Sequence, residues 1–374
     1  MTAPHALPMP KWGMTMTEGT LVDWLVPEGA VVEQGQEIAE VETTKIANAI
    51  EAPVSGILRR QVAAPGMSVP VGGLLGVFAD AATTDAEIDA FVAARAAVGP
   101  EAAAAAPAPR LIETAGGPLN LLSLGGDGDG LPVVLLHGFG GDLGSWMFNA
   151  ETLAADRPVH VPDLPGHGAS PPRSATTVGD LAQAVAGVCD ALSVPRVHLA
   201  GHSLGGAVAL ALATASPGRI ASLALVAPVG LGREISAEYL TSFLAADRRR
   251  PMKQALSLLF SDPAAVNSDM VEGVLRSTRR DGVLQALAAT LAGFFDPAGA
   301  QKLDLRPALA AFRGPVIVIW GEADAILPVV QSEGLPGPTA VHRIPGVGHM
   351  PMMEAAGTVN RLLAAHFAAA DLAG

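Results

Sequence analysis

The sequence predicts two domains: an all-β domain, followed by an α/β domain whose sheet is mostly parallel. Its 374 residues exceed what one ordinary hydrophobic core organises. Residues 1–79 contain short alternations of apolar and polar residues, which are typical of strands. From Leu111 to residue 374, short apolar runs alternate with segments of helical length, as in parallel-sheet proteins. Residues 80–110 separate these two parts.

The composition excludes several classes of function. The formal net charge is −13, so neither nucleic acid nor an anionic membrane is expected as a partner. Cys189 is the only cysteine, which rules out an intrachain disulfide and fits a reducing cytosol. The first twelve residues do not resemble a secretory signal, and no apolar run reaches membrane-spanning length. We expect a cytoplasmic chain that acts on small molecules or protein partners, and we predict no metal site.

The β domain repeats itself at an offset of 37 residues. Gly29 recurs as Gly66 and Gly35 recurs as Gly72, and apolar positions around them match as well. The repeat predicts two equivalent halves around one core, with these glycines in turns that need a positive φ.

Lys45 falls where the first half ends, in a polar stretch that suits an exposed hairpin turn. A surface lysine is usually only a solvated charge, but the duplicated framework favours a special role here.

Residues 7–79 resemble the lipoyl domains of 2-oxo acid dehydrogenase complexes, in which a Glu-Thr-x-Lys turn carries lipoate on its lysine. The resemblance implies a flattened β-barrel with lipoate on Lys45, attached by a lipoate-attaching enzyme. Biotin carriers share the architecture, but their lysine typically sits between two methionines, whereas Thr44 and Ile46 flank Lys45. Thr44 also replaces the aspartate that usually precedes the modified lysine.

Residues 80–110 are rich in Ala, Pro and acidic residues and are expected to form a linker. A short helix is predicted over 85–98, and the remainder is predicted to be an extended tether. Many multienzyme acyltransferases carry a small basic module for partner binding at this point. Only Arg95 and Arg110 are basic here, so we infer that this module is absent.

The second domain contains the motif Gly201-His202-Ser203-Leu204-Gly205. An apolar run at 197–200 precedes it and a helical segment at 207–215 follows, which is the context that a Gly-x-Ser-x-Gly nucleophile requires. Ser203 would therefore expose its hydroxyl above the sheet. The other runs expected to form buried strands are Val133–Leu136, Val159–Val161, Leu223–Val226 and Val316–Trp320.

Asp324 and His349 complete a candidate catalytic triad with Ser203. Asp324 follows the strand predicted at 316–320, His349 follows the run 341–344, and the order Ser, Asp, His is that of α/β-hydrolases. A serine hydroxyl is a poor nucleophile near neutral pH, so His349 would take its proton while Asp324 holds the imidazole tautomer. Taken singly, Ser203 fits a helix cap, Asp324 a turn and His349 an ordinary polar group.

The surroundings of the triad can also be predicted. The backbone N–H groups of Phe139 and Leu204 are placed to form an oxyanion hole. His167 and His202 are interpreted as structural. Residues 232–311 interrupt the strand pattern with Ala- and Leu-rich helical segments, and we expect them to form a helical cap that restricts water.

Residues 111–374 resemble α/β-hydrolases, and a lipoyl domain joined to this fold resembles the acyltransferase component of acetoin dehydrogenase complexes. The His-x-x-x-Asp-Gly motif of ordinary 2-oxo acid complexes does not occur in the sequence. The resemblance implies that acetyl arrives on the lipoyl arm from a thiamine-diphosphate-dependent component that cleaves acetoin, and leaves on coenzyme A. It also implies a flavin-dependent dihydrolipoamide dehydrogenase. We expect a homo-oligomer.

Three functions remain open from the sequence. In the first, Ser203 takes acetyl from the lipoyl thioester and passes it to coenzyme A. In the second, the chain is an esterase or thioesterase tethered to a lipoyl carrier domain, and in the third it is a scaffold with a vestigial triad. Arg248-Arg249-Arg250 and Arg276, Arg279 and Arg280 are candidates for binding coenzyme A phosphates, although such charge runs are usually solvated faces.

Overall fold

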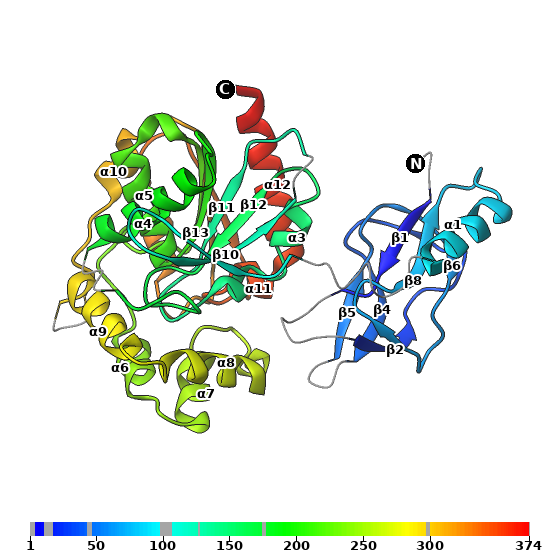
Figure 1. Ribbon diagram of the computed structural model, residues 1–374, viewed down its shortest axis with the longest axis horizontal. Coiled ribbons are helices and arrows are strands. Elements are labelled where there is room, and N and C mark those ends of the chain that lie inside the picture. Colours follow the sequence, from blue (N-terminus) through cyan, green and yellow to red (C-terminus); the bar gives the residue numbers. More distant parts are fainter. Residues whose placement is uncertain are drawn as a thin grey trace. The chain divides into compact units, whose positions relative to one another are not determined.

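The computed structural model describes residues 4–10, 18–42, 47–97, 107–125, 128–173, 177–296 and 300–373. The chain divides into two compact units, residues 1–106 and residues 107–374 (Figure 1). In its described residues, the first unit contains strands and one helix, and the second is an α/β unit, which confirms the predicted fold class.

The first unit is built from two four-stranded antiparallel sheets, with strand orders β1-β8-β6-β3 and β5-β4-β2-β7. Strands β2, β3 and β4 recur about 37 residues later as β6, β7 and β8, so each sheet combines strands from both halves of the repeat. If each strand is replaced by its counterpart from the other half of the repeat, the strand order of one sheet becomes that of the other. The strands are β1 (His5–Pro8), β2 (Glu18–Trp24), β3 (Val31–Val32), β4 (Glu37–Glu42), β5 (Ala47–Glu51), β6 (Gly56–Gln61), β7 (Ser68–Pro70) and β8 (Leu74–Ala79).

The repeated residues occupy equivalent environments. Leu21 and its counterpart Leu58 are both completely buried, and they lie in one apolar core between the sheets. Gly29 and Gly66 have φ values of 88° and 84°, which only glycine adopts without strain. The predicted duplication is therefore confirmed in the packing and in the turns.

Helix α1 (Asp85–Ala97) confirms the short helix that was predicted over 85–98, within the expected linker. Thr84 caps it, because its hydroxyl accepts from the Glu87 N–H (3.3 Å) while the Glu87 carboxylate accepts from the Thr84 N–H (2.8 Å). Ile88 is completely buried, and Arg59 forms an ion pair with Asp85 at 2.9 Å. The helix thus packs on the first unit instead of lying in an extended tether. Residues 98–106 lie outside the described part of the chain.

The second unit contains an eight-stranded sheet of order β16-β15-β14-β13-β11-β12-β10-β9. All its pairings are parallel except those of β10 with β12 and with β9. The two strands β9 and β10 were not predicted. The strands are β9 (Arg110–Ile112), β10 (Leu119–Leu124), β11 (Val133–Leu136), β12 (Val159–Pro162), β13 (Val197–His202), β14 (Ile220–Val226), β15 (Val316–Gly321) and β16 (Thr339–Ile344).

Helices cover both faces of this sheet, with α4 and α5 on one face and α3 and α12 on the other (Figure 1). Helices α6 to α9 gather at one end of the unit, whereas α10 packs against α5, so the part of 232–311 that caps the site is shorter than expected. The helices are α3 (Ala150–Leu153), α4 (Val178–Ala191), α5 (Leu204–Ala215), α6 (Ala237–Ala245), α7 (Arg249–Ser257), α8 (Ser268–Thr278), α9 (Val283–Phe294), α10 (Arg306–Ala311), α11 (Pro351–Glu354) and α12 (Ala356–Ala373), with short 3₁₀ turns at 143–146, 217–219, 263–265 and 329–332.

The apolar core of the second unit lies on both sides of the sheet. Trp320 on β15, Trp146 beside β12 and Phe367 on α12 are all completely buried. This rigid core holds the carboxyl ends of the parallel strands, where the candidate site residues lie. Within the described residues, no helix combines the length and the apolar character needed to cross a membrane.

Candidate active site

Ser203 lies on the sharp turn between β13 and α5. Its backbone has φ 52° and ψ −114°, a conformation that costs a side-chain-bearing residue about 1–3 kcal/mol. Glycine is required on both sides of it: a Cβ at Gly201 would lie 2.3 Å from the carbonyl oxygen of Gly205, and a Cβ at Gly205 would lie 2.4 Å from that of Leu136. The predicted strand–turn–helix context of the motif is present.

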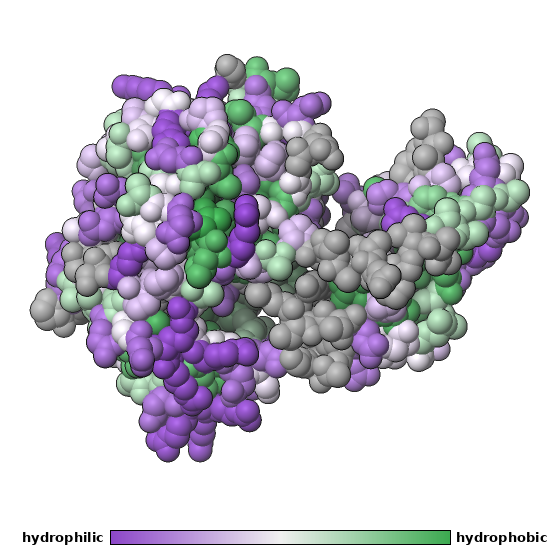
Figure 2. Space-filling view, viewed as in Figure 1, coloured by the Kyte–Doolittle hydropathy of each residue, from purple (hydrophilic) through white to green (hydrophobic). Residues whose placement is uncertain are grey.

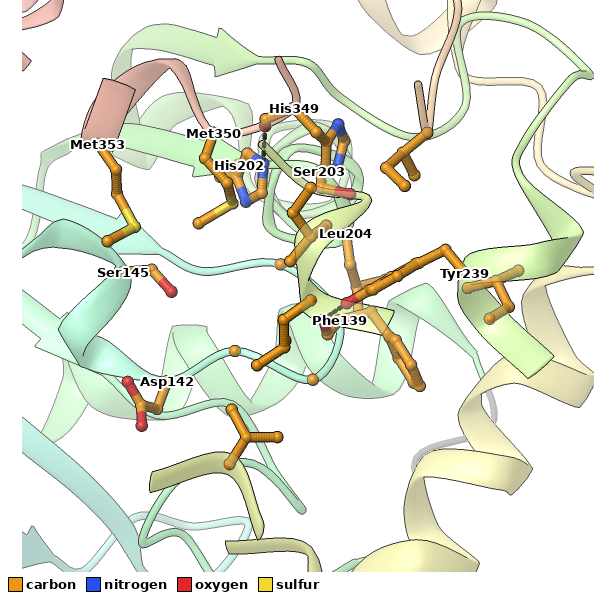
Figure 3. A pocket seen from close by; sticks show the side chains of 18 of the residues that line it. Phe139, Asp142, Ser145, His202, Ser203, Leu204, Tyr239, His349, Met350 and Met353 are labelled. Carbon is orange, nitrogen blue, oxygen red and sulfur yellow. Dashed lines mark hydrogen bonds between the residues drawn. The ribbon is translucent and has the colours of Figure 1, made fainter. Parts of the chain in front are cut away.

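His349 and Asp324 are paired. His349 Nδ1 lies 2.8 Å from Asp324 Oδ2, and the two side chains are 2% and 0% exposed. Asp324 Oδ1 accepts hydrogen bonds from the backbone N–H groups of Ile326 (2.8 Å) and Leu327 (2.9 Å), which fix the carboxylate. An imidazole that donates its Nδ1–H to a carboxylate keeps Nε2 as a proton acceptor. Ser203 and His349 line the same cavity (Figure 3).

His202 connects the serine turn to the histidine loop. Its Nε2 lies 2.8 Å from the carbonyl oxygen of His349, the contact drawn as a dashed line in Figure 3. The His349 N–H in turn donates to the Leu259 carbonyl at 2.9 Å. Burial, and then the neighbouring His349, hold the pKa of His202 well below its usual value. His202 is therefore a neutral donor that positions His349, in keeping with the structural role expected for it.

Phe139 and Leu204 supply the backbone N–H groups of the candidate oxyanion hole, and both residues line the cavity. Leu204 begins α5, so its N–H has no acceptor within the helix. The Gly138 carbonyl, which belongs to the same peptide unit as the Phe139 N–H, accepts from His137 Nδ1 (2.8 Å) and from the Gly141 N–H (3.2 Å). The carbonyl and N–H of a trans peptide point in opposite directions, so these bonds aim the Phe139 N–H away from His137.

His137 and His167 form a neutral pair behind this peptide. Their ring centroids are 5.1 Å apart. Burial lowers the pKa of His137 to about 4, and burial together with the neighbouring His137 lowers the pKa of His167 to about 3. His137 Nε2 accepts from the Leu164 N–H at 3.0 Å, which leaves its proton on Nδ1 for the Gly138 carbonyl. His167 Nδ1 lies 3.0 Å from the Pro165 carbonyl oxygen, so His167 is structural, as expected.

A cavity of about 210 Å³ surrounds Ser203 and His349. Its lining is mainly apolar. Among the buried polar groups of the lining, the Tyr239 hydroxyl donates to the Phe139 carbonyl at 3.3 Å. Asp142 also lines the cavity, and burial together with the nearby Asp163 raises the pKa of its carboxyl to about 6. The apolar lining comes from the cap residues Leu240, Leu256, Met270, Val274, Leu291 and Phe294 and from Met147, Met350 and Met353 of the core.

The basic residues of the cap mostly have protein partners. Figure 2 shows that the surface over α7 and α8 is hydrophilic. Arg249 pairs with Glu272, and Arg248 pairs with Asp247 at 3.1 Å. Arg280 donates to the carbonyl oxygens of Gly168, Ala169 and Ser170, and therefore ties the cap to the loop after β12. These bonds give Arg280 a structural role, so it is a weaker candidate for binding the phosphates of coenzyme A.

Lys45 lies outside the described residues. The strands on either side of it, β4 and β5, pair with each other, with Glu42 opposite Ala47, so Lys45 is one of the four residues that connect two paired strands. Within the described ranges, no three His, Cys, Asp or Glu side chains are arranged to hold a metal ion.

Comparison with known proteins adds to this geometry. A family model described as alpha/beta hydrolase fold matches residues 132–356, and one described as biotin-requiring enzyme matches residues 5–78. The dihydrolipoyllysine-residue acetyltransferase component of the acetoin cleaving system of Pseudomonas putida is 45% identical over 98% of this chain and 99% of its own. The chain belongs to this acetyltransferase family. The Cupriavidus necator acetyltransferase of the same description is 42% identical over 96% of each chain.

The second unit of this chain also resembles solved hydrolase structures. A meta-cleavage product hydrolase from Pseudomonas fluorescens IP01 superposes with a TM-score of 0.62, at 21% identity, over 70% of this chain and 98% of its own. At this identity, the likeness establishes the fold alone.

Sequence reasoning missed three residues that organise the site. No role was predicted for His137, although the His137-Gly138 pair directly after β11 is a signal for it. Tyr239 donates a hydrogen bond to Phe139, and Arg280 donates hydrogen bonds to the loop at 168–170. Both contacts join segments that are about 100 residues apart in the sequence. No local pattern marks such long-range contacts.

Proposed function

We propose that this chain transfers acetyl from S-acetyldihydrolipoyl-Lys45 to coenzyme A, as the acyltransferase component of an acetoin-cleaving system. One observation carries the proposal: a lipoyl-type domain and a cavity that contains Ser203 and the His349–Asp324 pair belong to the same chain. The names of the relatives that are 45% and 42% identical support it.

In the first half of the reaction, Ser203 Oγ attacks the thioester carbonyl while His349 Nε2 takes the serine proton. The N–H groups of Phe139 and Leu204 bind the oxyanion that develops. The carbon–sulfur bond then breaks, and His349 returns its proton to the departing sulfur. Acetyl is left as an ester on Ser203. Asp324 stabilises the imidazolium and keeps its tautomer throughout.

The second half reverses these roles with another thiol. His349 takes the proton of the coenzyme A thiol, whose sulfur attacks the Ser203 ester. The same oxyanion hole binds the second tetrahedral oxyanion. When the carbon–oxygen bond breaks, His349 gives the proton back to Ser203 Oγ, and the site is regenerated. Water competes for the same ester, so the apolar cap must exclude it during this interval.

Lipoate bound to Lys45 supplies a thiol that carries acetyl as a thioester between sites. The position fits such a group, because Lys45 connects the paired strands β4 and β5 and is flanked by Thr44 and Ile46. The two-sheet duplication around it is the framework of a carrier domain.

The proposal includes a set of partners in the cytoplasm. A thiamine-diphosphate-dependent component loads acetyl, a flavin-dependent dihydrolipoamide dehydrogenase reoxidises the dithiol, and a lipoate-attaching enzyme modifies Lys45. The chain is proposed to work as a homo-oligomer. Its net charge of −13 argues against nucleic acid or an anionic membrane as a further partner.

The decisive experiment supplies S-acetyldihydrolipoamide to the full chain with and without coenzyme A, and measures acetyl-CoA against acetate. We expect acetyl-CoA to dominate at saturating coenzyme A and Ser203→Ala to abolish its formation. Dominant acetate under these conditions would instead favour the tethered esterase or thioesterase, which the same Ser–His–Asp geometry supports. Full activity of Ser203→Ala would favour a scaffold.

A further inference from the structure

The cavity around Ser203 is larger than acetyl requires. An apolar cavity of about 150 Å³ is known to hold one benzene molecule, which has six carbon atoms. The cavity here measures about 210 Å³. Acetyl has two carbon atoms, so it fills only a small part of this space. An apolar space that stays empty contributes nothing to binding, which raises the question of what occupies it.

The acyl group is the occupant that best fits the lining. It stays on Ser203 between the two half-reactions, whereas the thiol is exchanged. The pantetheine arm of coenzyme A contains two amides, and burying them against side chains such as Leu240, Val274 and Phe294 would leave them without hydrogen-bond partners. An alkyl chain needs none. The four methionines Met147, Met270, Met350 and Met353 are flexible and adapt to chains of different shape.

Gly273 keeps part of this cavity open. It lies in the middle of α8, on the helix face that also presents Met270 and Val274 to the cavity. Glycine is a poor helix former, and neither backbone conformation nor crowding requires it here. Its φ is not in the left-handed region, and a Cβ at this position would have no atom within 4 Å. The missing side chain therefore leaves space beside the cavity lining.

We propose that this site accepts acyl groups of about four to six carbons in addition to acetyl, and that Gly273 sets the upper limit of their size. The inference rests on the proposed acyltransferase function and specifies its substrate class. Its chemistry is unchanged, because the same carbonyl carbon passes from thioester to Ser203 and then to coenzyme A.

The first test compares acetyl, butanoyl, hexanoyl and octanoyl thioesters of dihydrolipoamide with the full chain and saturating coenzyme A. We expect kcat/KM for acyl-CoA formation to rise by up to about fourfold per added methylene until the cavity is filled, and then to fall. A tenfold or greater loss from acetyl to butanoyl would overturn the proposal. If every donor yields free acid instead of acyl-CoA, the acyltransferase function itself fails, which is a distinct result.

The second test uses Gly273→Leu, which places a side chain in the open space. We expect kcat/KM for butanoyl and hexanoyl transfer, each divided by kcat/KM for acetyl transfer, to be tenfold or more lower in the variant than in the wild type. Ser268→Leu adds the same side chain at an exposed position of α8 and should leave the profile unchanged. If Gly273→Leu does not fold, Gly273→Ala should show a smaller shift in the same direction. An unchanged profile in a folded Gly273→Leu would sink the proposal.

A third comparison separates the acyl group from the carrier arm. Acetyl thioesters of dihydrolipoamide analogues with shortened hydrocarbon arms are assayed with the wild type. We expect kcat/KM to change less than twofold for each methylene removed from the arm. A steep loss with arm length, together with no gain from longer acyl groups, would show that the cavity holds the arm, and would contradict the inference.

Discussion

At the scale of single residues, the site depends on how side chains and peptides are held. Ser203 has a strained backbone, Asp324 is fixed by two N–H groups, and the Gly138–Phe139 peptide is held by His137. Each of these groups has a defined orientation before any substrate arrives, so little reorganisation is needed during the reaction.

The first residue-scale prediction concerns Asp324→Asn. An asparagine amide would donate to His349 Nδ1 and force the proton onto Nε2, so that His349 can no longer accept the Ser203 proton. We expect kcat for acetyl transfer to fall by about 10⁴-fold with the fold retained. Asp142→Asn is the matched control, because it changes another carboxyl that lines the same cavity, and it should lower kcat less than about threefold. Equal losses in the two variants would contradict the role of Asp324.

The second residue-scale prediction concerns acid stability. The pKa of His167 is about 3 in the folded chain and near 6.5 when unfolded, so the unfolded chain binds more protons between these values. Stability from this residue is complete above pH 6.5 and is lost as the pH falls. Between pH 7 and pH 5, we expect the free energy of unfolding to drop by about 1–2 kcal/mol more in the wild type than in His167→Phe. Urea titrations followed by tryptophan fluorescence measure this difference. An equal drop in the free energy of unfolding of the two proteins would contradict the prediction.

At the scale of secondary-structure elements, the sequence predicted those strands that are buried on both faces of the sheet. The runs at β11, β13 and β15 are buried throughout and mainly apolar, because parallel strands lie between two helical layers. Strand β10 includes Asn120 and Ser123 near the sheet edge, so it has no such signature. Helix α1 was predicted, but its docking was not, because a single residue, Ile88, provides the fully buried contact.

The triad could be predicted for a similar reason. Ser203, Asp324 and His349 each follow a strand of the parallel sheet, whose carboxyl ends meet at one edge. The cap could be predicted only as a helical region. Its attachment through Arg280, and the contact of Tyr239 with Phe139, join segments that are far apart in the sequence.

An element-scale prediction tests the attachment of the cap. Arg280→Met removes the donors to the carbonyls of Gly168, Ala169 and Ser170, and should lower the free energy of unfolding by about 1–3 kcal/mol. Arg250→Met, at an exposed position on α7, should change it by less than about 0.5 kcal/mol. Thermal and urea unfolding of the full chains measure both. A loss of coenzyme A affinity in Arg280→Met without any loss of stability would instead assign Arg280 to the cosubstrate.

At the scale of the whole molecule, the chain combines a carrier with a catalyst. Helix α1 belongs to the carrier unit, so the segment that joins the two units is shorter than the composition of 80–110 suggested. In the proposed reaction, acetyl therefore reaches Ser203 through the lipoyl arm on Lys45 and the short segment between the two units.

Lys45→Arg tests whether Lys45 carries acetyl to the Ser203 cavity. The arginine keeps the charge but accepts no lipoate, so the mass increment of lipoylation should disappear from the intact chain. Turnover coupled to the acetoin-cleaving component should fall to background, while transfer from free S-acetyldihydrolipoamide should stay within about twofold of the wild type, because the variant leaves the Ser203 cavity untouched. Undiminished coupled turnover would exclude Lys45 as the carrier.

The duplicated β-sandwich has one further consequence. The pair β5-β4 in one sheet corresponds to β1-β8 in the other, so the connection that contains Lys45 has a geometric twin. At that twin position the polypeptide enters and leaves the sandwich, because β1 is its first strand and β8 its last. No continuous hairpin exists there to present a second lysine. In the proposed reaction, the twofold repeat therefore offers one attachment site for lipoate, and each chain carries one acyl group in each cycle.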